Sequence, residues 1–358
     1  MPSLKEIKGR INSISSTLAI TSAMKMVAAA KLQKAQMAIQ NMLPYERRLH
    51  SMLIDLMGAM NISAAASEDG SVRGSGSAER GFDQSGDRLS LSNRHDLAGM
   101  DGAYSLMAQR QVHRVAIVAF ASNSSLCGAF NSNVIREATA VINEYRASGL
   151  GDADITVYSV GRKMAEAMKK LGFPSPADFT KMSDSPSYDA ASALAQELLD
   201  GFVSGRFDKV ELVYNHYKST SSQPTIRQTY LPLSLADATA DLQAGKIADS
   251  ASESDTNRGA EPVGAPVVRQ GSPTTEDLIV EPSKEELIAT LLPKVVRLRV
   301  FTTLLDSTAA EQAARTVAMQ LATDNGNDLL QELTLEYNKG RQQKITSEIL
   351  DLVGGSMQ

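Results

Sequence analysis

The turn at residues 122–131, SNSSLCGAFN, is the stretch most similar to a ligand-binding motif. It follows an apolar run, and a glycine-rich turn after a buried strand holds the phosphates of nucleotides in many α/β proteins. This turn has a single glycine, Gly128, and fits neither GxGxxG nor GxxxxGK[ST]. Because the backbone needs further glycines to close around a pyrophosphate, we predict that this turn binds no nucleotide cofactor.

The other reactive side chains are not spaced for chemistry. Cys127 is the sole cysteine, and the sequence places no histidine beside it, so a buried structural thiol is favoured over a nucleophile. The four histidines are scattered singly, without the spacing of metal ligands. Asp324 and Asp328 resemble an oxygen-rich cation site, but an EF-hand needs a central glycine and an acidic residue later than Glu332. The sequence therefore predicts no catalytic residue, no cofactor and no metal site.

The composition is that of a folded protein with an uneven charge distribution. The chain has 358 residues, 42% of them apolar, and no apolar run approaches the ~18 residues of a membrane span. The first residues lack the features of a secretion or transit signal, which predicts a location in a bacterial cytoplasm or on a surface that faces it. Residues 1–57 carry eight Lys or Arg and three Asp or Glu, whereas residues 236–283 carry three and nine. Charge asymmetry of this kind favours an acidic partner at the basic end, although an ordinary solvated helix face also explains it.

The stretch 1–60 has the pattern of one long helix. Ser3 is a candidate N-cap, and Glu6 completes a capping box with it. At ~1.5 Å per residue this helix is roughly 80 Å long, far longer than a globular domain requires, so it must lie against another long element. Its apolar residues alternate at spacings of three and four, which is typical of a coiled-coil seam: Leu4, Ile7, Ile11, Ile14 and Leu18.

The stretch 284–358 has the same character. A single apolar stripe continues almost to the end of the chain, and Gly326 and Gly340 are expected to weaken the helix locally. The two terminal helices match in length, and each has one stripe to cover. We therefore predict an antiparallel coiled coil of these two helices.

Between the helices, residues 113–235 alternate apolar runs with amphipathic helical segments. This order predicts an open α/β sheet with Rossmann-like topology. Two segments rich in Ser, Gly and charged residues flank it, at 61–112 and 236–283. Because such compositions bury little apolar surface, we expect both segments to be flexible insertions.

Three stretches resemble one known family. LKEIKGRINSISSTLAITSAMKMVAAAKLQKAQ (4–36) is similar to the opening helix of ATP synthase gamma subunits, and residues 311–355 are similar to their final helix. SLCGAFN (125–131) resembles the LCGGLN turn of the same family. The resemblance covers both terminal helices and most of residues 113–235, in the right order.

The resemblance implies a central-stalk rotor subunit without catalytic activity of its own. Such a subunit carries torque between the c-subunit ring, driven by protons or sodium ions, and the catalytic beta subunits. Its implied partners are the alpha and beta subunits of the head, the epsilon subunit and the c ring, with no nucleic acid and no small-molecule substrate. Its implied place is the cytoplasmic side of a bacterial inner membrane, as a peripheral protein.

The resemblance also implies which residues face the head. Carried over position by position, they are Met24, Arg315, Arg341, Gln342, Thr346 and Glu348. Cationic side chains opposite acidic loops of a partner make a favourable contact. From the residues alone, the alternative for Arg315 and Arg341 is a solvated charge.

The sequence departs from the family pattern in two respects. Ala129 and Phe130 stand where a second glycine and a leucine are usual, and SNSS replaces a run that often contains an arginine, so the contacts of that arginine are not expected here. The two insertions exceed the usual connections. An alternative class, an unrelated coiled-coil scaffold with an α/β head, also fits the pattern of elements and would be distinguished by co-purification with alpha and beta subunits.

Overall fold

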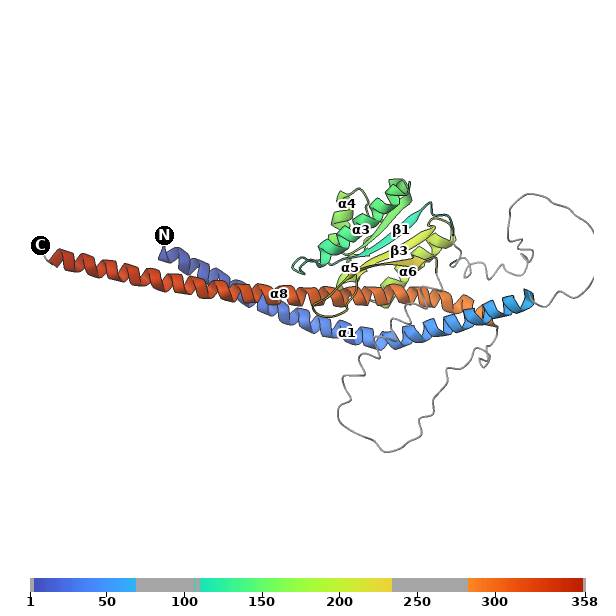
Figure 1. Cartoon of the computed structure of the whole chain (residues 1–358), viewed down its shortest axis with the longest axis horizontal. Coiled ribbons are helices and arrows are strands. Elements are labelled where there is room, and N and C mark those ends of the chain that lie inside the picture. The colour runs from blue at the N-terminus through green and yellow to red at the C-terminus, as the bar shows by residue number, and fades with distance from the viewer. Residues whose placement is uncertain (1–2, 69–105, 107–109, 234–282, 357–358) are drawn as a thin grey trace, which may run out of the picture.

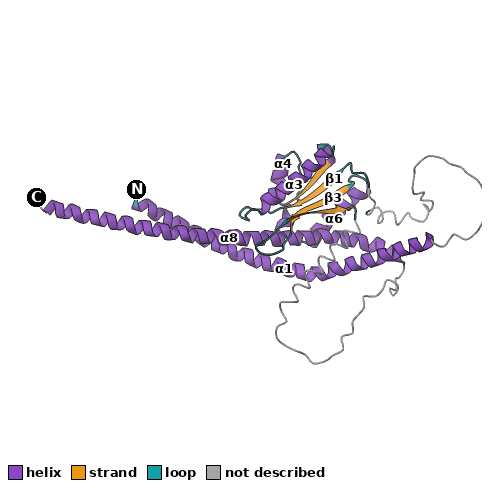
Figure 2. Cartoon of the chain, in the orientation of Figure 1, coloured by secondary structure: helices purple, strands orange, loops and turns teal. Residues whose placement is uncertain are grey.

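The computed structural model describes residues 3–68, 106, 110–233 and 283–356. Two long helices form a rod, and a small α/β domain lies against one side of it (Figure 1, Figure 2). This arrangement confirms the expected fold class, a coiled coil of the terminal helices with an open α/β domain. The expected insertions fall largely outside the described residues, at 69–105, 107–109 and 234–282.

Helix α1 (Leu4–Glu68) begins as the sequence predicts and ends later. The Ser3 hydroxyl accepts a hydrogen bond from the backbone N–H of Glu6 at 3.2 Å, which confirms Ser3 as the N-cap. The Glu6 carboxylate instead accepts a bond from Arg10 at 2.9 Å, so it is not the reciprocal partner that a capping box requires. The helix passes the expected boundary at residue 60, because the next residues include three alanines, the best helix formers.

Helix α8 (Lys284–Ser356) runs antiparallel to α1 over most of its length (Figure 1). The hydroxyl oxygens of Thr21 and Thr323 lie 3.0 Å apart across the pair. Near the middle of the rod the seam is built from small residues and one leucine, which bring the two helices close together: Leu32 and Ala35 of α1 with Ala309 and Ala313 of α8. Burial of this shared apolar stripe stabilises both helices, because intrinsic helix propensity alone contributes less to helix stability than packing does.

Two glycines of α8 mark the register of the rod near the N-terminus of α1. A Cβ atom on Gly326 would lie 2.6 Å from a methyl carbon of Leu18, and one on Gly340 would lie 3.1 Å from a methyl carbon of Leu4. Fourteen positions separate Leu4 from Leu18, and fourteen separate Gly326 from Gly340, so one antiparallel register covers this region. The glycines therefore do more than weaken the helix: they are the positions where leucines of α1 approach its backbone.

The α/β domain is built on a four-stranded sheet in the order β2-β1-β3-β4. Strands β1 (Val115–Phe120), β2 (Ile155–Val160) and β3 (Lys209–Asn215) are parallel, with β1 in the centre. Strand β4 (Thr225–Leu231) pairs with β3 in antiparallel fashion. The difference follows from the connections, since only a short hairpin loop joins β3 to β4, whereas helices join the parallel strands.

Helices cover both faces of this sheet. One face packs on α3 and α4 through a cluster that includes Val134, Ile142, Met164 and Met168. The other face packs on α5, α6 and α8. The connecting elements are α3 (Phe130–Ala147), η1 (Asp152–Asp154), α4 (Arg162–Lys170), α5 (Thr180–Asp184) and α6 (Tyr188–Val203). The two short helices among them, α5 and η1, are not predicted from the sequence.

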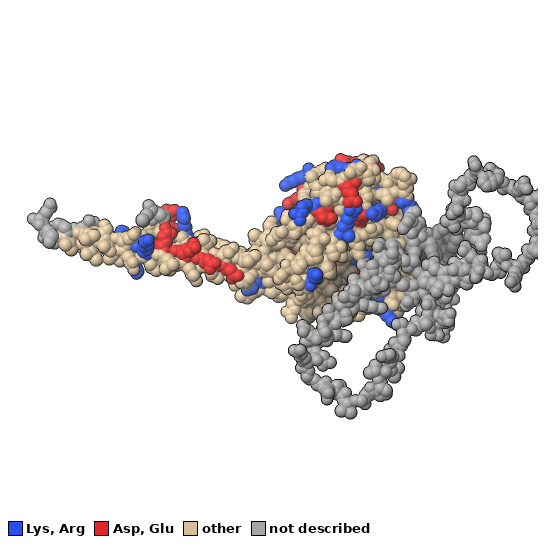
Figure 3. Space-filling view, viewed as in Figure 1, with Lys and Arg blue, Asp and Glu red and all other residues tan. Residues whose placement is uncertain are grey.

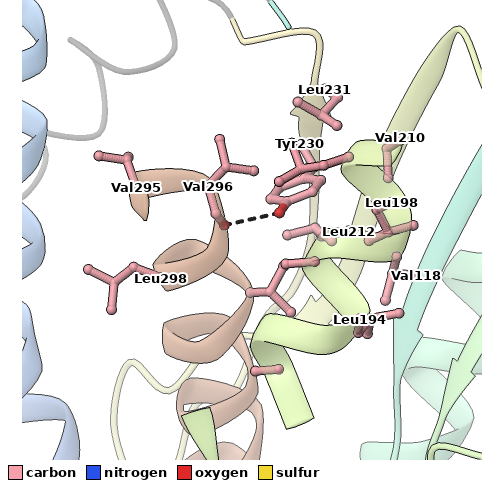
Figure 4. Packing of buried hydrophobic residues seen from close by; sticks show 14 of the residues in the cluster. Val118, Leu194, Leu198, Val210, Leu212, Tyr230, Leu231, Val295, Val296 and Leu298 are labelled. Atoms are coloured by element: carbon pink, nitrogen blue, oxygen red, sulfur yellow. Dashed lines mark hydrogen bonds between the residues drawn. The ribbon is translucent and has the colours of Figure 1, made fainter. Parts of the chain in front are cut away.

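Helix α8 is part of the core of the α/β domain. Figure 4 shows Val295, Val296 and Leu298 of α8 in one cluster with residues of α6, β1, β3 and β4. The Tyr230 hydroxyl, fully buried on β4, donates a hydrogen bond to the carbonyl oxygen of Val296 at 3.0 Å. The segment 113–235 therefore buries one face of its sheet by itself, whereas the other face needs α8 to complete its core.

The buried carboxylate of Glu211 links the edge strand β4 to helix α3. Glu211 on β3 is 1% exposed and accepts hydrogen bonds from the Tyr145 hydroxyl at 2.6 Å and the Arg227 Nε at 2.6 Å, and it pairs with Lys209 at 2.7 Å. Burial acts to raise the pKa of Glu211, but these donors outweigh it and hold the pKa below its ordinary value. The group ties α3, β3 and β4 together.

The register predicts opposite effects for two glycine substitutions in the rod. Gly326→Leu should lower the stability of the chain by about 1–3 kcal/mol, because the added side chain collides with Leu18. Gly9→Ala, on α1 with nothing within 4 Å of the new Cβ, should raise it by about 1 kcal/mol. Thermal unfolding followed by circular dichroism measures both. A Gly326→Leu chain as stable as the wild type would contradict this register.

Candidate functional site

Helix α8 closes the edge of the sheet where open α/β proteins usually bind ligands. That place lies beyond the carboxyl ends of the parallel strands. Here Cys127 and Phe130, from the turn after β1, pack directly on Ala310 of α8. The hollow that remains beside them has a volume of about 190 Å³ and reaches Asn215 and Leu321. Sites for drug-sized ligands and cofactors usually measure about 300–1,000 Å³, so the hollow is small for a nucleotide.

The turn after β1 has an unusual backbone. Leu126 has a φ of 69° and Gly128 a φ of 58°. The left-handed region costs a leucine roughly 1–2 kcal/mol, whereas glycine adopts it freely. Leu126 is nonetheless 59% exposed, so burial of its side chain does not explain the strain. Its position is fixed by the turn around it, in which the Asn131 side chain accepts from the Ser122 backbone N–H at 3.0 Å and donates to the Cys127 Sγ at 3.2 Å.

Arg315 of α8 holds this turn from the other side. Its guanidinium donates to the Ser125 carbonyl oxygen at 2.6 Å, to the Ser124 hydroxyl at 2.8 Å and to the Glu311 carboxylate at 2.7 Å. Arg315 is 8% exposed and Glu311 is 7% exposed. Burial raises the pKa of Glu311, although the ion pair with Arg315 opposes the rise. Within this chain the Arg315 side chain is therefore buried, and it joins α8 to the turn after β1.

The other residues expected to face a partner lie elsewhere on the rod. Met24 is half-buried in α1, beside the seam. Arg341, Gln342, Thr346 and Glu348 are all exposed on α8. They lie close to or beyond the point where α1 begins, since Leu4 is opposite Gly340. The structure thus brings these four together on one free helix end and separates them from Arg315.

The last turns of α8 carry large apolar side chains in contact with solvent. They are Ile345, Ile349, Leu350, Leu352 and Val353, each between 47% and 73% exposed. Four of these positions, Ile345, Ile349, Leu352 and Val353, fall on one face of the helix, and Leu350 widens that face. This face continues the apolar stripe of α8 past the point where the first turn of α1 lies against Gly340. The tip of α8 is therefore a contact surface that this chain alone leaves uncovered.

A row of carboxylates follows α8 below the tip. Asp324, Asp328, Glu332 and Glu336 recur every fourth residue and are all exposed (Figure 3). Gln320 donates to the Asp324 carboxylate at 2.8 Å. The two aspartates that resembled a cation site from the sequence belong to this longer row, and the described residues contain no group of three ligating side chains that could hold a metal.

Sequence reasoning also missed a polar contact between His216 of the domain and Asp306 of the rod. His216 and Asp306 meet at 2.6 Å, although ninety positions separate them. In the sequence His216 is an isolated histidine and Asp306 a single acidic residue in an apolar helix, so no local pattern pairs them. Within the described part of the chain, no helix has both the length and the apolar character needed to cross a bilayer.

Comparisons with known proteins agree with this geometry. A family model described as ATP synthase matches residues 3–357. The ATP synthase gamma chain of Phocaeicola vulgatus is 46% identical over the full length of both chains, and that of Bacteroides thetaiotaomicron is 45% identical over the same extent. A chain in the cryo-EM structure of the Euglena gracilis mitochondrial ATP synthase (OSCP, F1 and c-ring) shares the fold with a TM-score of 0.52 at 19% identity, covering 99% of this chain and 93% of that one. The chain belongs to the family of ATP synthase gamma chains, the central-stalk subunits of that enzyme.

Proposed function

We propose that this subunit is a torque-bearing shaft that turns within a ring of alpha and beta subunits. The observation that carries the proposal is the apolar tip of α8, which extends beyond α1 and exposes a wide face of large side chains. A tip of this kind is suited to turn inside an apolar sleeve, because contacts that are not directional can be exchanged during rotation. Catalysis then lies on the beta subunits of the head.

The α/β domain lies beside the rod, well away from the tip of α8 (Figure 1). We propose that it contacts the epsilon subunit and the c ring, and that flow of protons or sodium ions through the membrane turns it. The basic first helix and the exposed residues near the tip contact the head, with Met24, Arg341, Gln342, Thr346 and Glu348 as the contact residues. The protein is then peripheral, on the cytoplasmic side of a bacterial inner membrane. Family membership excludes the alternative of an unrelated scaffold.

The coiled coil should be required for assembly. Ile11→Asp combined with Leu18→Asp places two carboxylates in the half-buried seam, where each loses hydration, so the upper helices should separate. We expect lower helicity, faster amide exchange over the first turns of α1 and no assembly with alpha and beta subunits. Asn12→Asp with Ala19→Asp, on the exposed side of the same turns, should leave the helicity unchanged. Normal assembly and turnover of the seam variant would show that the paired helices are not the shaft.

Replacement by alanine of two arginines of α8 should affect different properties, activity for Arg341 and stability for Arg315. Arg341 is exposed, so Arg341→Ala should leave the stability of the chain unchanged and lower ATP hydrolysis by the reconstituted complex on the order of tenfold, through a lost contact with the head. Arg315→Ala leaves Glu311 buried without its partner and should cost about 3–5 kcal/mol of stability. Chemical denaturation and ATPase assays measure both effects. Equal destabilisation by the two variants would contradict these roles.

A further inference from the structure

The loop between β3 and β4 lies against both helices of the rod. Residues 216–224 form a tight hairpin, in which the Ser219 and Ser222 backbones pair in both directions and the Gln223 side chain donates to two loop carbonyl oxygens. The His216 N–H also bonds the Pro224 carbonyl oxygen at 2.9 Å. These bonds all lie within the loop, so they help to set its shape independently of the rod.

Asp306 anchors this loop on α8. One carboxylate oxygen is 2.6 Å from His216 Nδ1, and the other accepts the backbone N–H of Tyr217 at 2.9 Å. The Asp306 side chain is 18% exposed, so solvent competes with these bonds only partly. Two bonds from adjacent residues to one carboxylate fix the direction of approach as well as the distance.

Tyr217 carries the contact on to α1. Its hydroxyl accepts a hydrogen bond from the Gln36 side chain at 2.7 Å. Its ring packs against the cluster of Leu32 and Ala35 with Ala309 and Ala313, and also against the cluster of Cys127, Phe130 and Ala310. A single side chain therefore touches α1, α8 and the turn after β1.

We propose that Asp306 and Tyr217 form a clamp that passes torque from the α/β domain to both helices of the shaft. This inference rests on the proposed function of the subunit. Apolar side chains resist separation but allow sliding, because their attraction has no preferred direction. Hydrogen bonds weaken steeply when they are bent, so the clamp opposes sliding of the loop along either helix. Asp306 and Tyr217 are positioning residues, since they act through the shaft and not on a reacting group.

The clamp should depend on pH through His216. The hydrogen bond with Asp306 raises the pKa of His216, while partial burial and the nearby Lys218 oppose the rise. The charged groups that act on His216 are thus Asp306 of α8 and Lys218 of the loop itself. A raised pKa means that the ion pair of His216 with Asp306 contributes fully below about pH 6.5, the ordinary pKa of a free histidine, and that this contribution is lost as the pH rises through the higher pKa in the folded chain.

Amide hydrogen exchange in the full-length chain tests the geometry. Asp306→Ala removes both bonds, so the Tyr217 amide should exchange on the order of tenfold faster. Asp306→Asn keeps an acceptor for that amide and should restore part of the protection, without its dependence on pH. His216→Gln should likewise remove the dependence on pH. Unchanged exchange of the Tyr217 amide in Asp306→Ala would overturn the clamp.

Rotation under load tests the role in torque. Complexes of this chain with alpha and beta subunits would carry a bead on the α/β domain, and ATP-driven rotation would be followed as the viscous load increases. We expect Asp306→Ala to hydrolyse ATP at the wild-type rate without a bead and to turn severalfold more slowly than wild type under high load. Tyr217→Phe, which loses only the bond to Gln36, should show a smaller loss.

Asp152→Ala is the matched control. It removes an ion pair of the same 2.6 Å length, with Arg146, from the α/β domain at a place away from the rod, and should rotate like the wild type. If Asp306→Ala rotates normally under load, or if Asp152→Ala is equally slow, the clamp is wrong and the proposed function stands. If the wild-type chain fails to assemble with alpha and beta subunits, the proposed function fails and the torque role of the clamp fails with it.

Discussion

The structure depends on the burial of one apolar stripe along a helix of sixty-five residues. A helix of this length cannot be covered by a small domain, and in isolation it would expose its stripe to water. Among the elements of the described residues, only α8, with seventy-three residues, is long enough to cover it. Because α1 and α8 come from opposite ends of the chain, their pairing closes the whole fold and determines where the α/β domain lies.

Helix α8 also packs against the α/β domain, and this packing explains why the carboxyl edge of the sheet is filled. Its residues between Ile288 and Leu304 complete one face of the sheet, and the next turns, around Ala310, fill the carboxyl edge of the parallel strands. An edge that binds ligands in other open α/β folds is here an attachment point for a helix. Arg315 and Asp306 are the polar parts of this attachment. They hold the turn after β1 and the loop after β3, the two segments that leave that edge nearest to α8.

Much of this fold can be predicted from the sequence, because its signals are local. The spacing of Leu4, Ile7 and Ile11 indicates a seam, and runs rich in apolar residues mark the three parallel strands. The contacts that join the parts cannot be predicted in this way. Arg315 meets Ser125 across 190 positions, so a solvated charge and a buried one look alike in the sequence. The left-handed backbone of Leu126 likewise follows from bonds across the turn and not from leucine itself.

The changing burial along α8 shows why its periodicity alone could not locate the site. Between Val295 and Ala313 the helix is buried on most sides, by the domain and by α1 together. From Thr323 to Gly340 only a stripe against α1 is covered, at spacings of three and four. From Arg341 onward each described side chain is exposed. The apolar pattern is similar in all three zones, so the sequence shows a continuous helix. What differs is how much of the helix the rest of the chain covers, and the exposed zone is where a partner has to supply further contacts.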